Sequence, residues 1–190
     1  FNMYCIDHKM NCGQLHLIVG CMYSGKSTEL LKIINHYKIL DKKVLAINHS
    51  SDHRYGDNSI ISHDKKSHPS LMTNSLMKIN NKCINTDIII IEEAQFFADL
   101  KDFVCKMLEK NKIIYVAGLD GDSFMKPFGQ ILDLIPICDS IKKLSALCIK
   151  CKDGTVANFT KRIVTNSEQT LIGSFESFIP VCRFHHSDQC

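Results

Sequence analysis

Residues 20–27, GCMYSGKS, indicate the fold because they join an apolar run to a helical pattern. Residues 15–19 (LHLIV) are typical of a buried strand, and apolar residues recur at helical spacing after residue 28. A glycine loop in this position can turn its backbone N–H groups inward around a phosphate, while Lys26 reaches the outer phosphates and Ser27 offers its hydroxyl to Mg²⁺. The sequence therefore predicts an ATP site formed by Gly20, Met22, Ser24, Gly25, Lys26, Ser27 and Thr28.

The composition suits one compact domain with a small appendage. The 190 residues carry a formal net charge of +3, and 45% of them are hydrophobic. No basic block and no Lys/Arg stripe interleaved with aromatic residues occurs, so no nucleic-acid partner is predicted. The sequence has no signal-peptide pattern and no apolar run approaching ~18 residues, which favours a reduced, cytoplasmic location without membrane contact. The ten cysteines are then core residues or metal ligands.

Apolar runs alternate with helical patterns over most of the chain. The predicted strands are residues 14–19, 44–47, 88–91, 113–117 and 140–147, and the predicted helices are 28–40, 70–77, 96–109 and 129–134. We expect residues 14–19 to be the central strand and residues 49–69 to form a long polar loop. This order predicts an α/β fold with a mostly parallel sheet.

Two neighbouring carboxylates, Glu92 and Glu93, follow a run of four isoleucines. Neighbouring residues of a strand point to opposite sides of a sheet, so we expect the two glutamates to have different roles. Glu92 occupies the place of the Walker B acid that binds Mg²⁺, and Glu93 is the candidate general base that takes a proton from an attacking hydroxyl. The alternative is a solvated strand end without a chemical role.

After residue 147 the pattern changes to short, turn-rich segments, which bury too little surface to be stable without a cross-link such as a metal ion. Cys148 and Cys151 form one pair of metal-ligand spacing, and Cys182 and His185 form a second. We predict that these four residues bind a structural Zn²⁺, with His186 as an alternative fourth ligand and an accidental match as the other interpretation. The predicted domains are residues 1–147, which bind ATP, and residues 148–190, which bind zinc.

Motifs in a characteristic order resemble the type II thymidine kinases, the zinc-containing class of animal cytosol, bacteria and large DNA viruses. They are the glycine loop G-x-M-x-S-G-K-S-T, the segment EEAQFF at 92–97, GLDG at 118–121 with KPFG at 126–129, TKR at 160–162, and the zinc pattern. The resemblance covers residues 14–185. It implies a P-loop, RecA-like ATP-binding domain and a small zinc domain whose lasso, residues 170–180, closes over thymidine.

The resemblance also implies an activity and a set of site residues. The family transfers the γ-phosphoryl group of ATP to the 5′-hydroxyl of thymidine or deoxyuridine in DNA precursor salvage, forms homotetramers and is inhibited by thymidine triphosphate. Glu93 matches the family's catalytic base, and Asp52 and Arg54 match its D-x-R element near the phosphate-transfer site. The residues that match the nucleoside pocket are Met22, Gln95, Phe96, Leu119, Phe124, Phe128, Thr160, Ile172, Gly173 and Phe178.

The sequence departs from the family pattern at three places. The zinc ligands form a Cys₃His set where Cys₄ is common, and Phe178 stands where the lasso often has Tyr. Ser123 stands where an aromatic residue is common, so either Phe124 has taken that role or the pocket is looser.

Two rival functions fit part of the sequence. A P-loop nucleic-acid motor with a zinc ribbon leaves Glu93 unexplained and predicts a more basic surface. An interaction protein with a vestigial ATP site is disfavoured because Lys26, Ser27 and both glutamates are intact.

Overall fold

Six parallel strands form the central sheet of the computed structural model, which describes residues 12–51, 59–61, 66–164 and 176–187. Their order is β5-β2-β6-β7-β1-β8, and every neighbouring pair is parallel. The predicted α/β fold is confirmed. The prediction that the strand before the glycine loop is central is wrong, because β1 is second from the edge, with only β8 beyond it among the described strands. The strands are β1 (Gln14–Gly20), β2 (Val44–His49), β5 (Leu71–Thr73), β6 (Ile88–Ile91), β7 (Ile113–Gly118) and β8 (Ser140–Leu144).

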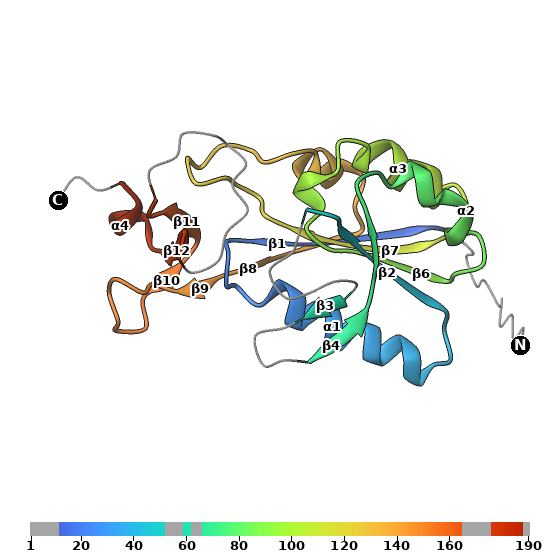
Figure 1. Cartoon of the computed structure of the whole chain (residues 1–190), viewed down its shortest axis with the longest axis horizontal. Helices are drawn as coiled ribbons and strands as arrows, with labels where there is room; N and C mark the ends of the chain where they lie inside the picture. The colour runs from blue at the N-terminus through green and yellow to red at the C-terminus, as the bar shows by residue number, and fades with distance from the viewer. Residues whose placement is uncertain (1–11, 52–58, 62–65, 165–175, 188–190) are drawn as a thin grey trace, which may run out of the picture.

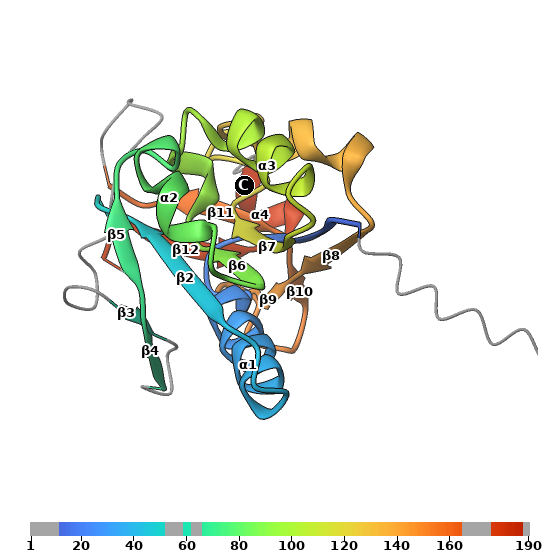
Figure 2. The same cartoon turned by 90° about the vertical axis from the view of Figure 1, so that its right-hand side faces the viewer.

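Helices cover both faces of the sheet. Helix α1 (Lys26–Ile39) lies on one face, and α2 (Asn80–Cys83), α3 (Leu100–Leu108) and the 3₁₀ helix η3 (Ile131–Ile137) lie on the other (Figures 1 and 2). Alternate isoleucines of β6 serve the two layers: Ile88 and Ile90 pack on the α1 side, whereas Ile89 and Ile91 pack with Phe103 of α3. Burial on both faces explains the unbroken apolar run. Among the described helices, none has the length and apolar character that crossing a membrane needs.

Two predicted segments differ from the structure. Residues 49–69, expected to form a loop, contain the antiparallel strands β3 (Ser59–Ile61) and β4 (Ser67–Pro69), and Ile60 is fully buried on the α1 side of the sheet. Residues 70–77, expected to form a helix, begin with the edge strand β5, followed by the short 3₁₀ helix η1 (Met77–Ile79). The register of Leu71 with Ile47 shows the cause, since pairing with β2 outweighs a weak helical pattern.

Short strands and one helix form a module at one end of the molecule (Figure 1). Strand β9 (Ala146–Leu147) pairs with β10 (Val156–Ala157), and β11 (Phe159–Arg162) pairs with β12 (Phe178–Val181), both antiparallel. Helix α4 (Arg183–Ser187) follows. The predicted strand 140–147 is therefore divided, since β8 joins the main sheet and β9 joins this module.

Asp99 ties the segment before η1 to the start of α3. Its carboxylate accepts hydrogen bonds from the Ser75 hydroxyl (2.6 Å) and from the N–H groups of Leu76 (3.2 Å) and Met77 (3.0 Å). Burial opposes ionisation, but the Met77 N–H and the Ser75 hydroxyl outweigh it and lower the pKa of Asp99. A carboxyl whose pKa is lower in the folded state stabilises the fold above its unfolded pKa, and this stability is lost as the pH falls through the folded pKa.

We expect Asp99→Ala to lower the free energy of unfolding by about 1–3 kcal/mol at pH 7, because three hydrogen bonds to a charged acceptor are lost. The difference from the native protein should begin to shrink as the pH falls below about 4, the ordinary pKa of an aspartate, and should be smallest below the lowered folded pKa, where the carboxyl is protonated in both states. Urea unfolding measures both effects. The exposed Asp102, in α3, supplies the control Asp102→Ala, and equal losses in the two variants would contradict this role for Asp99.

Candidate active site and metal centre

The glycine loop connects β1 to α1 and ends at the helix N-terminus. A Cβ at Gly20 would lie 2.2 Å from the Leu144 carbonyl oxygen of β8, so no side chain fits there. Gly25, at the N-cap of α1, has a φ of +85°, in the left-handed region that glycine adopts without strain. The helix dipole and the N–H groups of the first turn, which point out of the helix end, make this end of α1 suited to an anion.

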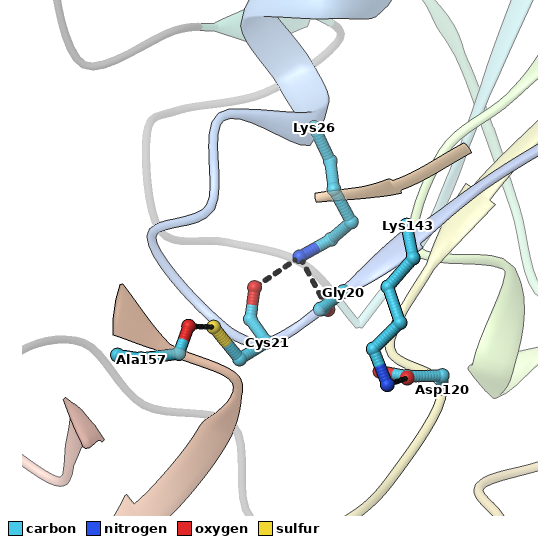
Figure 3. Close-up of polar contacts among 6 residues, drawn as sticks. All are labelled: Gly20, Cys21, Lys26, Asp120, Lys143 and Ala157. Carbon is cyan, nitrogen blue, oxygen red and sulfur yellow. Dashed lines mark hydrogen bonds and ion pairs between the residues drawn. The ribbon is translucent and has the colours of Figure 1, made fainter. Parts of the chain in front are cut away.

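The P-loop lysine lies across this loop. Its Nζ donates to the carbonyl oxygens of Cys21 (2.7 Å) and Gly20 (3.1 Å), as Figure 3 shows. Lys26 is the first residue of α1, and Ser27 and Thr28 follow in the first turn. The structure therefore brings the predicted phosphate-binding residues together at one helix end.

The two glutamates lie where β6 leaves the sheet. Glu92 is buried, and its N–H donates to the Ile47 carbonyl (2.9 Å), which continues the pairing of β6 with β2. Glu93 has a φ of +50°, an uncommon and strained conformation for a residue with a side chain. The sequence analysis expected the two carboxylates to point apart because neighbouring residues alternate along a strand. In the structure β6 ends at Ile91, and the two side chains are separated by the backbone turn at Glu93.

Gln95 connects Glu93 to the end of β7. Its Nε2 donates to the Glu93 Oε2 (2.5 Å), and its Oε1 accepts from the Leu119 N–H (3.0 Å). Because a backbone N–H can only donate, this second bond fixes which end of the amide faces Glu93. A Cβ at Gly118 would lie 2.5 Å from the Gln95 Oε1, so this glycine gives the amide its room. The family resemblance predicts that Gln95 lies beside the nucleoside pocket, and the structure adds its hydrogen bond to the Glu93 carboxylate.

Aromatic side chains lie beside this acid. The half-buried Phe96 packs edge-on against the buried Phe128, with ring centroids 5.6 Å apart. His49, at the end of β2, packs against Phe96 (5.6 Å) and edge-on against Phe97 (4.8 Å). Sequence analysis missed His49, although its position at the carboxyl end of a parallel strand was a usable signal.

The module of β9–β12 and α4, here called the end module, contacts the glycine loop through β11. The Thr160 hydroxyl accepts a hydrogen bond from the Met22 N–H of the glycine loop (3.0 Å). The Arg162 guanidinium carbon lies 5.3 Å from the Phe178 ring centroid and 5.8 Å from that of Phe124. Phe178 is buried, whereas Phe124 is half exposed and packs on Arg162. Four predicted site residues, Asp52, Arg54, Ile172 and Gly173, and most of the lasso lie outside the described residues.

A small pocket of about 130 Å³ lies between the glycine loop, the segment after β7 and the end module. Cys21, Asp120 and Thr160 are among the residues that line it. Asp120 forms an ion pair with Lys143 of β8 (2.7 Å), as Figure 3 shows. Sequence analysis missed this pair, since Lys143 belongs to no motif. The pocket marks the place where the three segments meet.

Four potential metal ligands converge at the other side of the module. The donor atoms of Cys148, Cys151, Cys182 and His185 all lie within 4.8 Å of one another. The His185 Nδ1 lies 3.6, 3.3 and 3.5 Å from the Sγ atoms of Cys148, Cys151 and Cys182, and the Sγ atoms of Cys151 and Cys182 are 3.8 Å apart. Tetrahedral zinc places its sulfur ligands about 3.8 Å apart and a sulfur and a nitrogen about 3.6 Å apart. The cluster therefore fits a structural Zn²⁺.

The pKa values of two of the clustered thiols are shifted in opposite directions. Burial raises the pKa of the Cys148 thiol, but the backbone N–H groups of Cys182, Cys151 and Lys150 outweigh it and lower the pKa to about 6. Burial and the neighbouring Cys148 raise the pKa of Cys151 to about 11. A cysteine ligand that keeps its proton would release it when a metal binds.

His186 has a different partner. Its Nε2 donates to the Ser123 carbonyl (3.1 Å), in the segment between β7 and η3, and its ring packs against Phe159 (5.6 Å). The geometry thus favours His185 over His186 as the fourth ligand.

A phosphate-binding loop and a positioned acid at the same edge of a parallel sheet define an ATP-dependent phosphotransferase of the P-loop class. Within that class, the thymidine kinase family model matches residues 13–186, and the chain belongs to this family.

Viral thymidine kinases are similar over most of their length. The chain is 43% identical to that of Yaba monkey tumor virus over 171 residues, which are 90% of this chain and 93% of the relative. It is 40% identical over 174 residues to the enzyme of variola virus and 42% identical over 175 residues to that of sheeppox virus, each match covering 92% of this chain and 97% of the relative.

We expect His185→Ala to weaken zinc binding at least about tenfold, because even the loss of a residue that only orients a ligand costs that much. Competition with a chromogenic chelator measures the affinity. The control is His186→Ala, which removes the neighbouring imidazole and should leave zinc binding unchanged. The reverse pattern would make His186 the ligand.

Proposed function

We propose that this thymidine kinase transfers the γ-phosphoryl group of ATP to the 5′-hydroxyl of thymidine, with Glu93 as the general base. The observation that carries the proposal is the Glu93 carboxylate, which is held by Gln95 at the sheet edge that also carries the P-loop. Phosphoryl transfer depends mainly on positioning and on charge stabilisation, which this arrangement supplies.

The nucleotide side of the site is formed by the P-loop and the first turn of α1. Backbone N–H groups bind the phosphate oxygens, and Lys26 moves from its carbonyl partners to the outer phosphates. Mg²⁺ would be held by the Ser27 hydroxyl and by Glu92, directly or through water, and it supplies neutralisation of the charge on the transferred group. The burial of Glu92 beside the sheet edge supports its part in this site.

Glu93 acts on the nucleoside side. As the sugar hydroxyl attacks the γ-phosphorus, Glu93 accepts its proton. The hydrogen bond from Gln95 fixes the direction of the carboxylate, since the amide is itself held by the Leu119 N–H. The strained backbone at Glu93 supports the same role, because such strain is found where function requires a fixed geometry.

In this proposal the nucleoside lies beside Phe96 and Phe128, and their edge-on pair forms one wall of the nucleoside pocket. Met22, Leu119, Phe124, Thr160 and Phe178 complete the pocket, with residues 170–180 reading thymine through their backbone. Such backbone groups cannot exchange donor for acceptor, so deoxycytidine would leave polar groups unpaired, whereas deoxyuridine lacks only a methyl group. The parts of Asp52, Arg54, Ile172 and Gly173, the homotetramer, inhibition by thymidine triphosphate and the cytoplasmic location stay predictions from the sequence.

We expect Glu93→Gln to lower kcat by about 10²–10⁴-fold, because the amide keeps the shape of the side chain and loses its basicity. Thymidine affinity should stay near the native value, which separates loss of the base from loss of the pocket. Steady-state kinetics and equilibrium binding of thymidine measure the two quantities. Glu109→Gln, at an exposed position after α3, is the matched control and should be fully active.

Near-normal turnover of Glu93→Gln would remove Glu93 from this role.

A further inference from the structure

Hydrogen bonds join the glycine loop to the end module, β9–β12 and α4, which carries the metal cluster and is called the zinc module from here on. The Met22 N–H donates to the Thr160 hydroxyl of β11 (3.0 Å), and the Cys21 Sγ donates to the Ala157 carbonyl of β10 (3.3 Å; Figure 3). Met22 is 9% exposed and Thr160 is 4% exposed, so water does not readily replace the threonine. The module therefore provides partners for the backbone and side chains of the loop that binds phosphate.

The bond to Thr160 fixes one peptide group of that loop. The peptide between Cys21 and Met22 is trans, so its N–H and its C=O point in opposite directions. Its N–H is held by Thr160, and its carbonyl accepts from the Lys26 Nζ (2.7 Å) on the other side (Figure 3). A rotation of this peptide would break both contacts. Thr160 thus determines the orientation of a carbonyl that contacts the P-loop lysine.

The next residue of β11 is tied to the metal cluster. The Lys161 Nζ donates to the carbonyl oxygen of His185 (2.9 Å), whose imidazole is one of the four clustered ligands. Side chains alternate along a strand, so Thr160 and Lys161 point to opposite sides of β11. One short strand therefore connects the metal cluster to the nucleotide loop.

We propose that Thr160 is a positioning residue of the ATP site, through which the zinc module sets the conformation of the P-loop. The sequence resemblance assigned Thr160 to the nucleoside pocket, and its hydrogen bond gives it this additional task. The inference rests on the proposed function only in taking the P-loop as the site of ATP. Thr160 does not touch the reacting atoms, and its effect passes through the peptide between Cys21 and Met22.

The test compares Thr160→Val, which keeps the shape and loses the acceptor, with Thr160→Ser, which keeps the hydroxyl. Binding of N-methylanthraniloyl-ADP with Mg²⁺ is followed by fluorescence, alongside KM for ATP, KM for thymidine and zinc content. We expect Thr160→Val to weaken nucleotide binding about tenfold, since a buried N–H loses its partner, and Thr160→Ser to stay within about twofold of the native protein. Both variants should retain zinc. Thr86→Val, which removes a hydroxyl that bonds to the Cys83 carbonyl far from the loop, is the matched control.

Unchanged nucleotide affinity in Thr160→Val, with or without a higher KM for thymidine, would overturn the proposal. If Thr160→Val fails to fold, Lys161→Met replaces it, because this change loosens β11 from the metal cluster without touching the loop. We expect it to weaken nucleotide binding about threefold, and an unchanged affinity would again overturn the proposal. The titration needs no turnover, so a failure of the proposed function would be seen separately, as a native protein that binds nucleotide and does not phosphorylate thymidine.

Discussion

The parallel pairing of β2, β6, β7 and β1 is the constraint on which the site depends. Because these strands run in one direction, their carboxyl ends meet at one edge of the sheet, where open α/β folds bind their ligands. The P-loop follows β1, the two glutamates follow β6 and Leu119 follows β7. Hydrophobic burial on both faces holds this edge in place, since a slip of one residue in β6 would exchange the two layers of isoleucines.

The zinc module depends on its metal cluster more than the sheet depends on any single contact. Its own buried apolar core consists of Cys148, Ala157, Ile179 and Val181, two of which neighbour or belong to the cluster. So small a core supplies little stability, which is why a metal ion bound by four side chains suits this module. The same module provides Thr160, which bonds to the glycine loop, and Phe178, which we propose for the nucleoside pocket. Metal binding, local folding and substrate binding would therefore be linked in this part of the chain.

Local spacing made part of this structure predictable from sequence. The P-loop, the isoleucine strand and the Cys/His pairs each combine a required residue type with a short, fixed separation. The β5 strand was missed because its weak local pattern is overridden by pairing with the distant β2. The hairpin of β3 and β4 was missed because strands of three residues are too short to show a clear alternation. The contacts of Gln95 with Leu119 and of Thr160 with Met22 join residues 24 and 138 positions apart, and no local pattern records them. The choice between His185 and His186 likewise needed the folded geometry, which gives each imidazole its own partners.

The most direct test of the account is the fate of the γ-phosphoryl group. The native protein is incubated with γ-labelled ATP, Mg²⁺ and thymidine, deoxyuridine or deoxycytidine in turn, with and without DNA, and the labelled products are separated. We expect labelled thymidine and deoxyuridine monophosphates, little deoxycytidine monophosphate and no effect of DNA. Label released as inorganic phosphate in a DNA-dependent way would indicate a nucleic-acid motor. Efficient labelling of deoxycytidine, or no transfer to any nucleoside, would contradict the account of the site itself.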